Sequence, residues 1–210
     1  MRLDAGLPAG TANNAGQLRV AVAGQTVLVV WRDLRPSATG LYCNRSLDAG
    51  ATWLAAPVRL TAVPSSPGDP ELVFTGPDAH VAWSDLRTGA PRVLYQRSAD
   101  AGATWQALEQ RLDTGVATNV LPGSVAVASD GMAVHVVWSQ VRNNDAIREI
   151  YANRSLDGGA TWRQNDQKLS APVAPSTWVF GEPRVAVLGT SVTAAWLRSG
   201  TGPPYVTSEV

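Results

Sequence analysis

The chain has 210 residues, of which 45% are apolar, so it is not a disordered chain and can build one or two domains with a sizeable core. Its 17 basic and 17 acidic residues cancel, so we expect neither nucleic acid nor an anionic membrane as a partner. The single cysteine, Cys43, excludes an intrachain disulfide, and no apolar run is long enough to span a bilayer.

Pairs of strand-like segments recur along the chain, with turn residues between the two members of each pair. The first members cover residues 18–23, 71–75, 124–128 and 184–188. The second members are apolar runs that end in tryptophan, at residues 26–31, 80–83, 133–138 and 191–196. Successive apolar positions suit a sheet that is packed on both faces. We therefore predict antiparallel strand pairs and no long helix.

An octet of the form S-x-D-x-G-A-T-W occurs three times, at residues 46–53, 98–105 and 155–162. Its aspartate can accept hydrogen bonds from nearby backbone amides, its glycine supplies a positive φ, and its tryptophan anchors the next strand. One carboxylate per octet is too few for a calcium site, so we expect no metal. The defining residues are Ser46, Asp48, Gly50, Thr52 and Trp53, then Ser98, Asp100, Gly102, Thr104 and Trp105, then Ser155, Asp157, Gly159, Thr161 and Trp162.

Two further segments complete each repeating unit. A third segment carries Tyr42, Tyr95, Tyr151 or Tyr205, and a fourth segment follows each octet at residues 59–61, 111–113 and 168–170. Four short antiparallel strands in a repeat of about fifty residues are typical of a propeller blade. The predicted fold class is therefore all-β, a β-propeller of four-stranded antiparallel blades.

The two ends of the chain predict how such a ring closes. Residues 2–6 match residues 111–115, and residues 205–210 match residues 95–100, so the chain begins with a lone fourth strand and ends within a third one. We expect residues 1–210 to form a single domain of about four blades, in which the N-terminal strand completes the last blade and closes the ring. Two alternatives to this monomer stay open: a fragment of a larger propeller, and a homo-oligomer such as an eight-bladed ring of two chains.

The octet resembles the Asp-box, or BNR repeat, of the sialidase-like β-propellers, a family that contains sialidases, other glycoside hydrolases, lectins and receptor ectodomains. The resemblance covers essentially the whole chain. It implies that the octets lie on the face away from the ligand site, and it implies an extracellular or periplasmic location. Residues 1–16 nevertheless lack the basic-then-apolar pattern of a signal peptide.

A second repeated motif follows the tryptophan-ending strands, on the face opposite the octets. Its polar members can bind sugar hydroxyls or a carboxylate, or they can bridge neighbouring blades while each tryptophan fills the core between blades. These candidates are Asp33, Arg35, Asp85, Arg87, Gln140, Arg142 and Arg198.

The starts of the first strands break the symmetry of the repeat. We align Arg19, Glu71, Ser124 and Arg184 at one position, and we take Arg19, Glu71 and Arg184 as candidate ligand-binding residues. A closed ring would bring Arg19 and Arg184 together near the central channel. Two adjacent guanidinium groups could bind an anion or form a solvated rim.

The signals for catalysis are weaker. A sialidase of the resembled family should offer three arginines, a tyrosine nucleophile paired with a glutamate, and an acidic acid/base, but its Phe-Arg-Ile-Pro motif is absent. Glu149 and Tyr151 lie on the same side of a strand and are one candidate pair. The carboxylates of Asp33 and Asp85 are another, because glycoside hydrolysis uses two carboxylates at a set separation. His80 and His135 have no clustered cysteines or carboxylates, and we expect neither metal nor cofactor.

We therefore expect a non-catalytic recognition module that binds a glycan or a protein partner on the face opposite the octets. The alternatives are a sialidase-like glycoside hydrolase, or a fragment of one, and a structural propeller scaffold without a small-molecule ligand.

Overall fold

The computed structural model describes residue 3 and residues 15–35, 39–62, 65–87, 91–115, 121–142, 147–170 and 179–199. These residues form four antiparallel sheets. Sheet 1 contains β1 (Ala15–Ala23), β2 (Thr26–Asp33), β3 (Gly40–Ser46) and β4 (Val58–Arg59). Sheet 2 contains β5 (Glu71–Thr75), β6 (Asp78–Asp85), β7 (Arg92–Ser98) and β8 (Gln110–Arg111). Sheet 3 contains β9 (Leu121–Asp130), β10 (Ala133–Val141), β11 (Arg148–Ser155) and β12 (Gln167–Lys168), and sheet 4 contains β13 (Val179–Leu188) and β14 (Ser191–Ser199).

The strands pair in chain order in every sheet, so the predicted all-β arrangement of antiparallel repeats is confirmed. Sheets 1, 2 and 3 each have the four expected strands, and the octet connects the third strand to the fourth. The predicted third strand of the last unit, with Tyr205, lies outside the described residues. The second strands run further than the apolar pattern suggests, because the hydrogen-bond ladder continues past each tryptophan into polar residues.

The register corrects one alignment made from the sequence. Arg19, Glu71 and Arg184 each pair with the residue that precedes the tryptophan of the next strand. In sheet 3 that residue is Val137, and its partner is Ala126 rather than Ser124. The prediction was wrong by two residues because the β9–β10 hairpin turns at Gly131 and Met132 alone, so β9 continues through Ser129 and Asp130.

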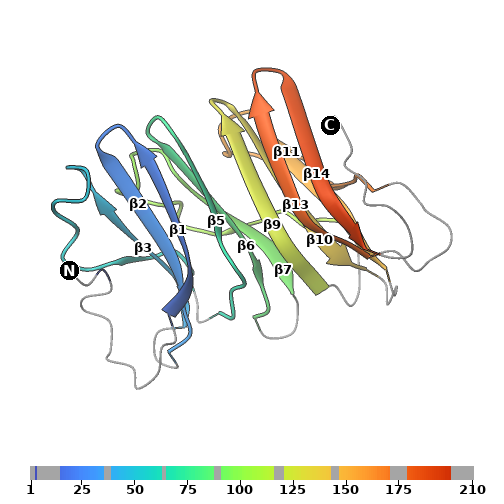
Figure 1. The fold of residues 1–210 in the computed structure, drawn as a ribbon, viewed down its shortest axis with the longest axis horizontal. Helices are drawn as coiled ribbons and strands as arrows, with labels where there is room; N and C mark the ends of the chain where they lie inside the picture. Colours follow the sequence, from blue (N-terminus) through green and yellow to red (C-terminus); the bar gives the residue numbers. More distant parts are fainter. Residues whose placement is uncertain are drawn as a thin grey trace.

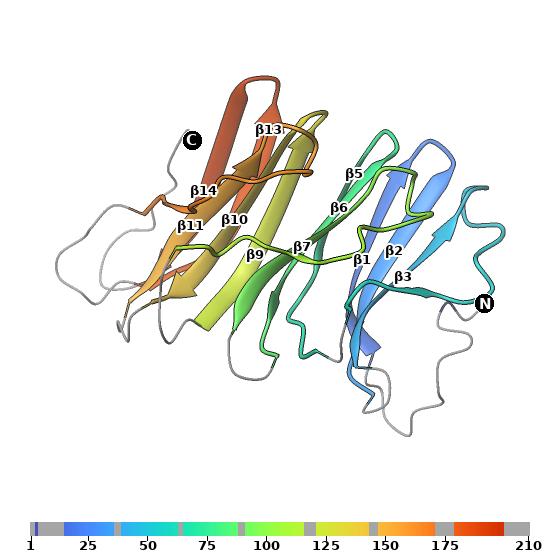
Figure 2. The same cartoon turned by 180° about the vertical axis from the view of Figure 1, so that it is seen from behind.

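The four sheets are stacked in a row, with sheet 1 at one end and sheet 4 at the other (Figures 1 and 2). We call the side of a sheet that looks toward the sheet 4 end of the row its back face and the opposite side its front face, so the front face of sheet 1 is an outer side of the row. Val30 and Leu41 on the back of sheet 1 pack against Trp83 and Leu94 on the front of sheet 2. Similar apolar clusters join sheets 2 and 3 around Trp138, and sheets 3 and 4 around Ile150 and Trp196. Burial of these clusters stabilises the row.

Ring closure within one chain is not seen in the described residues. Leu3 lies against the front face of sheet 1, and its carbonyl accepts a hydrogen bond from Asn44 Nδ2 at 2.9 Å. This is the place that the fourth strand of a preceding sheet would take. Sheet 4 is at the opposite end of the row, however, and so does not meet sheet 1 there (Figures 1 and 2). The other residues of the two chain ends lie outside the described residues.

The octets and the turns between first and second strands share one edge of the row. The amides of Ala49, Ala101 and Gly158 donate to the carbonyls of Gln25, Pro77 and Met132, which lie in or beside those turns. The starts of the first strands and the ends of the second strands therefore lie at the opposite edge. The described residues contain no helix that could cross a membrane.

Candidate ligand site between the inner strands

The three octets are self-contained turns. In the first, Ser46 Oγ donates to Asp48 Oδ1 at 2.6 Å, and the Thr52 amide and hydroxyl donate to the same carboxylate at 2.7 and 2.6 Å. These hydrogen bonds stabilise the charged form and lower the pKa of Asp48 to about 2. The other two octets repeat the arrangement, and the same bonds lower the pKa of Asp100 to about 2 and that of Asp157 well below its usual range. The octet carboxylates thus have most of their acceptor capacity used within their own turns.

The second repeated motif is buried. Asp33, Asp85 and Gln140 have no exposed surface. The Arg35 guanidinium pairs with Asp33, Arg87 Nη2 with Asp85 at 2.7 Å, and Arg142 Nε with the amide oxygen of Gln140 at 2.8 Å. The Trp83 and Trp138 indoles donate to Asp85 and Gln140 at 3.2 and 2.9 Å. These side chains fix the ends of the second strands.

The motif also ties neighbouring sheets together through two acidic residues that the sequence analysis missed. Arg87 pairs with Glu109 at 2.7 Å, and Glu109 accepts a hydrogen bond at 3.1 Å from the Ala62 amide, which follows the last strand of sheet 1. Arg142 and Asp166 repeat this one sheet further, with Asp166 accepting from the Gly115 amide. Burial alone would lower the pKa of Arg87, but its bonds to Glu109 and Asp85 raise it. Both acids stand two residues before the basic residue of the fourth segment, a signal visible in the sequence.

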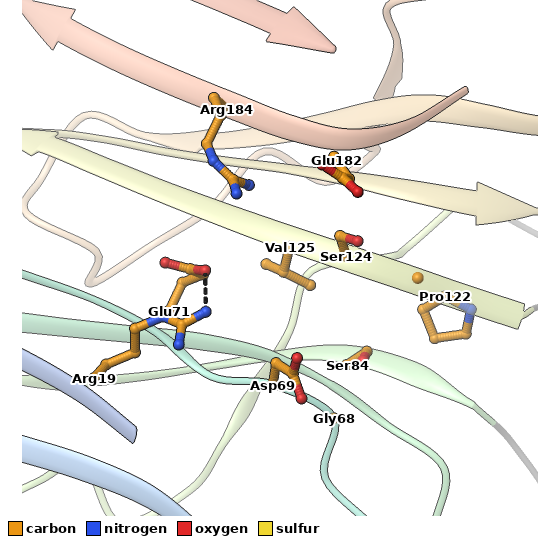
Figure 3. A pocket seen from close by; sticks show the side chains of 11 residues that line it. Arg19, Gly68, Asp69, Glu71, Ser84, Pro122, Ser124, Val125, Glu182 and Arg184 are labelled. Carbon is orange, nitrogen blue, oxygen red and sulfur yellow. Dashed lines mark hydrogen bonds and ion pairs between the residues drawn. The ribbon is translucent and has the colours of Figure 1, made fainter. Parts of the chain in front are cut away.

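A pocket of about 550 Å³ opens where the first strands of all four sheets converge. Five charged side chains line it, as Figure 3 shows. Its volume lies within the usual range for small-molecule sites. The lining residues are Arg19, Gly68, Asp69, Glu71, Ser84, Pro122, Gly123, Ser124, Val125, Glu182 and Arg184.

The charges in the pocket differ in how they are engaged. Arg19 Nη2 pairs with Glu71 Oε1 at 2.8 Å, and that hydrogen bond raises the pKa of Arg19. Asp69 lies 3.7 Å from the Arg32 guanidinium. Arg184 Nη1 donates to its neighbouring carbonyl, Pro183 O, at 2.9 Å, and the guanidinium points into the pocket (Figure 3). The site therefore presents charges of both signs, which suits a ligand with many hydroxyl groups or a carboxylate.

Backbone geometry shapes the same pocket. Glu182 has φ 48° and Gln17 has φ 53°, and each lies two residues before the pocket arginine of its strand, inside a β-bulge. Non-glycine residues in the left-handed region are uncommon and concentrate at functional sites. Gly68 and Gly123 allow a close approach, because a Cβ on either would collide with Ser84 Oγ or with Ser139 Oγ.

The structure sorts the residues predicted for the site into two groups. Arg19, Glu71 and Arg184 line the pocket together. Asp69 and Glu182 also line the pocket and were not among the predicted residues, although each stands two residues before a predicted position, which was the available signal. The other predicted residues do not line the pocket: Asp33, Arg35, Asp85, Arg87, Gln140 and Arg142 form the buried pairs described above, and Arg198 is on β14. Ligand contact by any of them stays a prediction.

The remaining titratable candidates lie in the core between sheets. Tyr151 Oη donates to Glu149 at 2.9 Å, but burial and the Glu149 carboxylate raise the pKa of Tyr151, which disfavours the phenolate that a nucleophile needs. His80 Nδ1 lies 2.7 Å from Tyr95 Oη, and burial lowers the pKa of His80 to about 4. Burial also lowers the pKa of His135. In the described ranges, no three histidine, cysteine or acidic side chains gather as metal ligands.

Comparison with solved structures identifies the fold as a β-propeller. A mutant of Trypanosoma rangeli sialidase with trans-sialidase activity superposes with a TM-score of 0.57 and 13% identity, over 94% of this chain and 37% of that one. An α-L-arabinanase of Penicillium chrysogenum, solved with arabinobiose, superposes with a TM-score of 0.52 and 15% identity, over 86% of this chain and 59% of that one. The catalytic domain of the GH62 α-L-arabinofuranosidase of Coprinopsis cinerea superposes with a TM-score of 0.55 and 13% identity, over 97% of this chain and 71% of that one.

These similarities concern the fold and not the activity, because all three identities are low. The chain is thus built like the β-propeller glycoside hydrolases, and it spans 59% of the arabinanase chain and 55% of a Fusarium graminearum α-L-arabinofuranosidase chain. No protein-family model and no curated protein sequence matches it.

Proposed function

We propose that this chain is a non-catalytic recognition unit for glycans and that the pocket between the first strands of the sheets, β1, β5, β9 and β13, binds the sugar. The observation that carries the proposal is the convergence of charged side chains from three of the four repeats on one pocket of ligand size. The side chains of the octets and of the second repeated motif, in contrast, make hydrogen bonds and ion pairs within a sheet or between neighbouring sheets. A site that breaks the symmetry of a repeat protein is where a single ligand should bind.

The position of the pocket supports the same conclusion. The octets bind the turns at one edge of the row, whereas the pocket is built from the starts of the first strands near the other edge. The resemblance to the Asp-box propellers implies a ligand site on that side. The structural neighbours are glycoside hydrolases, so carbohydrate is the ligand class that the fold supports best.

The chemistry favours binding over cleavage. A sugar needs several hydrogen-bonding partners of both kinds, and Arg184, Ser84 and the carboxylates of Asp69 and Glu182 provide donors and acceptors within one pocket. Glu71 is held by Arg19, and Tyr151 is a poor nucleophile in the core between the sheets.

A binding experiment tests the proposal. The 210-residue chain is screened on a glycan array with neutral and acidic sugars, and arabinobiose and a sialoside are titrated calorimetrically. For the sugar that binds, Arg184→Ala should weaken binding by about tenfold or more, which corresponds to about 1.4 kcal/mol. Arg163→Ala is the matched control, because Arg163 pairs with Gln167 away from the pocket. Absence of binding to every sugar, or equal loss in both variants, would contradict the proposal.

A glycoside hydrolase is the second candidate, because Asp69, Glu71 and Glu182 place three carboxylates in one pocket and hydrolysis of a glycosidic bond uses two. Turnover of an aryl arabinofuranoside or a fluorogenic sialoside that is lost in Glu182→Gln would establish this activity in place of simple recognition.

A further inference from the structure

The front face of sheet 1 has an exposed apolar half. Val20 and Val22 on β1 are 53% and 60% exposed. Val20 pairs with Val29 in the register in which Leu72 pairs with Val81, Val127 with Val136 and Val185 with Ala194. Those three equivalents are partly buried against the core clusters that join each sheet to the preceding one. The face that is covered in sheets 2, 3 and 4 is therefore open at β1.

The outer half of the same face is organised as if a preceding sheet were present. Asn44 Nδ2 donates to the Leu3 carbonyl at 2.9 Å. In sheet 2, Gln96 Nε2 donates to the Leu60 carbonyl at 3.4 Å, and in sheet 3, Asn153 Nδ2 donates to the Leu112 carbonyl at 3.0 Å. Leu60 and Leu112 follow the fourth strands of the preceding sheets. Leu3 thus gives sheet 1 the contact that the segment after a preceding fourth strand gives sheets 2 and 3. Among the described residues, none packs on the β1 side of this face as the preceding sheet does in sheets 2, 3 and 4.

The first octet shows the same incomplete joint. A Cβ added to Gly102 would meet Leu28 of sheet 1, and one added to Gly159 would meet Tyr95 of sheet 2. A Cβ added to Gly50 would meet only Trp53 of its own octet, at 3.8 Å. The octets of sheets 2 and 3 therefore close against a preceding sheet, whereas no such contact is made by the octet of sheet 1 within the part of the chain that the structure describes.

The complementary surface is present at the other end of the row. The back face of sheet 4 presents Ala186, Thr193 and Leu197, all of them exposed. The register places Ala186 where Ala21 stands in sheet 1 and Ala128 in sheet 3, and it places Thr193 where Leu28 stands in sheet 1. Leu197 takes the place of Arg32, so of sheets 1 and 4 only sheet 4 is apolar at this end of its back face. The back faces of sheets 1 and 3 cover the front faces of the sheets that follow them.

From these observations we infer that the front face of sheet 1 binds the back face of sheet 4 of a second copy of this chain. The contact continues the sheet-to-sheet packing that the chain already makes between its own sheets. Because the two surfaces lie at opposite ends of the molecule, the association is head to tail (Figures 1 and 2). Such a heterologous contact gives a closed ring where the rotation permits and a longer assembly where it does not.

The test uses light scattering after gel filtration of the 210-residue chain over a concentration series. We expect the wild-type mass to rise above the 22.1 kDa of one chain as the concentration increases. Val20→Glu and Leu197→Glu should each lower association at least about tenfold, because each places a charge in one half of an apolar contact. Leu108→Glu is the control, since Leu108 is 75% exposed and belongs to neither sheet 1 nor sheet 4 but to the segment between β7 and β8.

Mixing the two variants gives the sharpest readout. The Val20→Glu chain keeps an intact sheet 4, and the Leu197→Glu chain keeps an intact sheet 1, so an equimolar mixture should form a 1:1 complex and stop there. A wild-type chain that stays monomeric throughout would overturn the inference. So would a mixture that stays monomeric while the wild type associates, or a Leu197→Glu chain that associates like the wild type, which would indicate a front-to-front contact. Circular dichroism of each variant checks that the fold is intact.

Discussion

Replacing each octet glycine with alanine should destabilise the protein, with the smallest loss at Gly50, an intermediate loss at Gly102 and the largest loss at Gly159. All three have positive φ, at 94°, 79° and 87°, so each alanine suffers the left-handed strain of about 1–2 kcal/mol. Their surroundings differ. An alanine Cβ at position 50 would meet Trp53 at 3.8 Å, an ordinary contact, whereas at position 159 it would collide with the Tyr95 hydroxyl and come within 2.8 Å of Tyr95 Cζ.

The collision at position 159 adds an overpacking cost of about 1–3 kcal/mol, because Tyr95 is fully buried and its hydroxyl is hydrogen-bonded to His80. We therefore expect losses of about 1–2 kcal/mol for Gly50→Ala and about 2–5 kcal/mol for Gly159→Ala. Gly102→Ala should fall between them, because its clash is with the flexible end of Leu28. Urea unfolding at constant slope measures the three values. Equal losses at positions 50 and 159 would refute the idea that the octets are joints between sheets.

Three further predictions concern stability. Ala49→Gly and Ala101→Gly should each raise the free energy of unfolding by about 0.5–1 kcal/mol, and Gly158→Ala should lower it. The reason is that all three residues have φ between 56° and 67°, which strains any residue except glycine. Unchanged stability in all three variants would argue against strain at the fourth residue of the octet. Trp83→Ala should cost about 3–5 kcal/mol and Trp53→Ala less, because the Trp83 ring is fully buried whereas the octet tryptophans are only partly buried; equal shifts in chemical unfolding would disprove the difference. Stability should also fall on acidification in two windows. Neutral His80 has a pKa lowered to about 4, so its contribution is complete above its unfolded value near 6.5 and is lost as the pH falls from 6.5 to 4. Asp48 and Asp100 have pKa values lowered to about 2, so the stability that their charged carboxylates contribute is lost as the pH falls from 4 to 2. His80→Gln should flatten only the first window and Asp48→Asn only the second, and a pH profile that neither variant changes would contradict the assignment.

Local features of the sequence predicted the fold well. The octets and the tryptophan-ending runs are signals within a few residues, and each corresponds to a turn or a strand. The register of β9 was harder, because Ser129 and Asp130 have the composition of a turn and yet pair with residues of β10. Closure of the ring could not be derived, because it depends on the summed geometry of successive sheets rather than on any one motif.

The site was predictable only in part. Arg19, Glu71 and Arg184 were identified because they break the symmetry of the repeat at positions that converge. The approach of Ser84 to Gly68 and the inward direction of Glu182 depend on packing between segments far apart in the chain. The ion pairs of the second motif also required knowledge of Glu109 and Asp166, which stand directly before the fourth strand of the same sheet.

The central claim is that glycans bind in the pocket between the inner strands and not at the octets. Glycine-selective nitrogen labelling and NMR titration with the sugar selected on the array test it most directly. We predict that the amide signals of Gly68 and Gly123, which line the pocket, shift progressively while those of Gly50, Gly102 and Gly159 stay in place. Shifts confined to the octet glycines would place the ligand on the opposite edge and contradict the account.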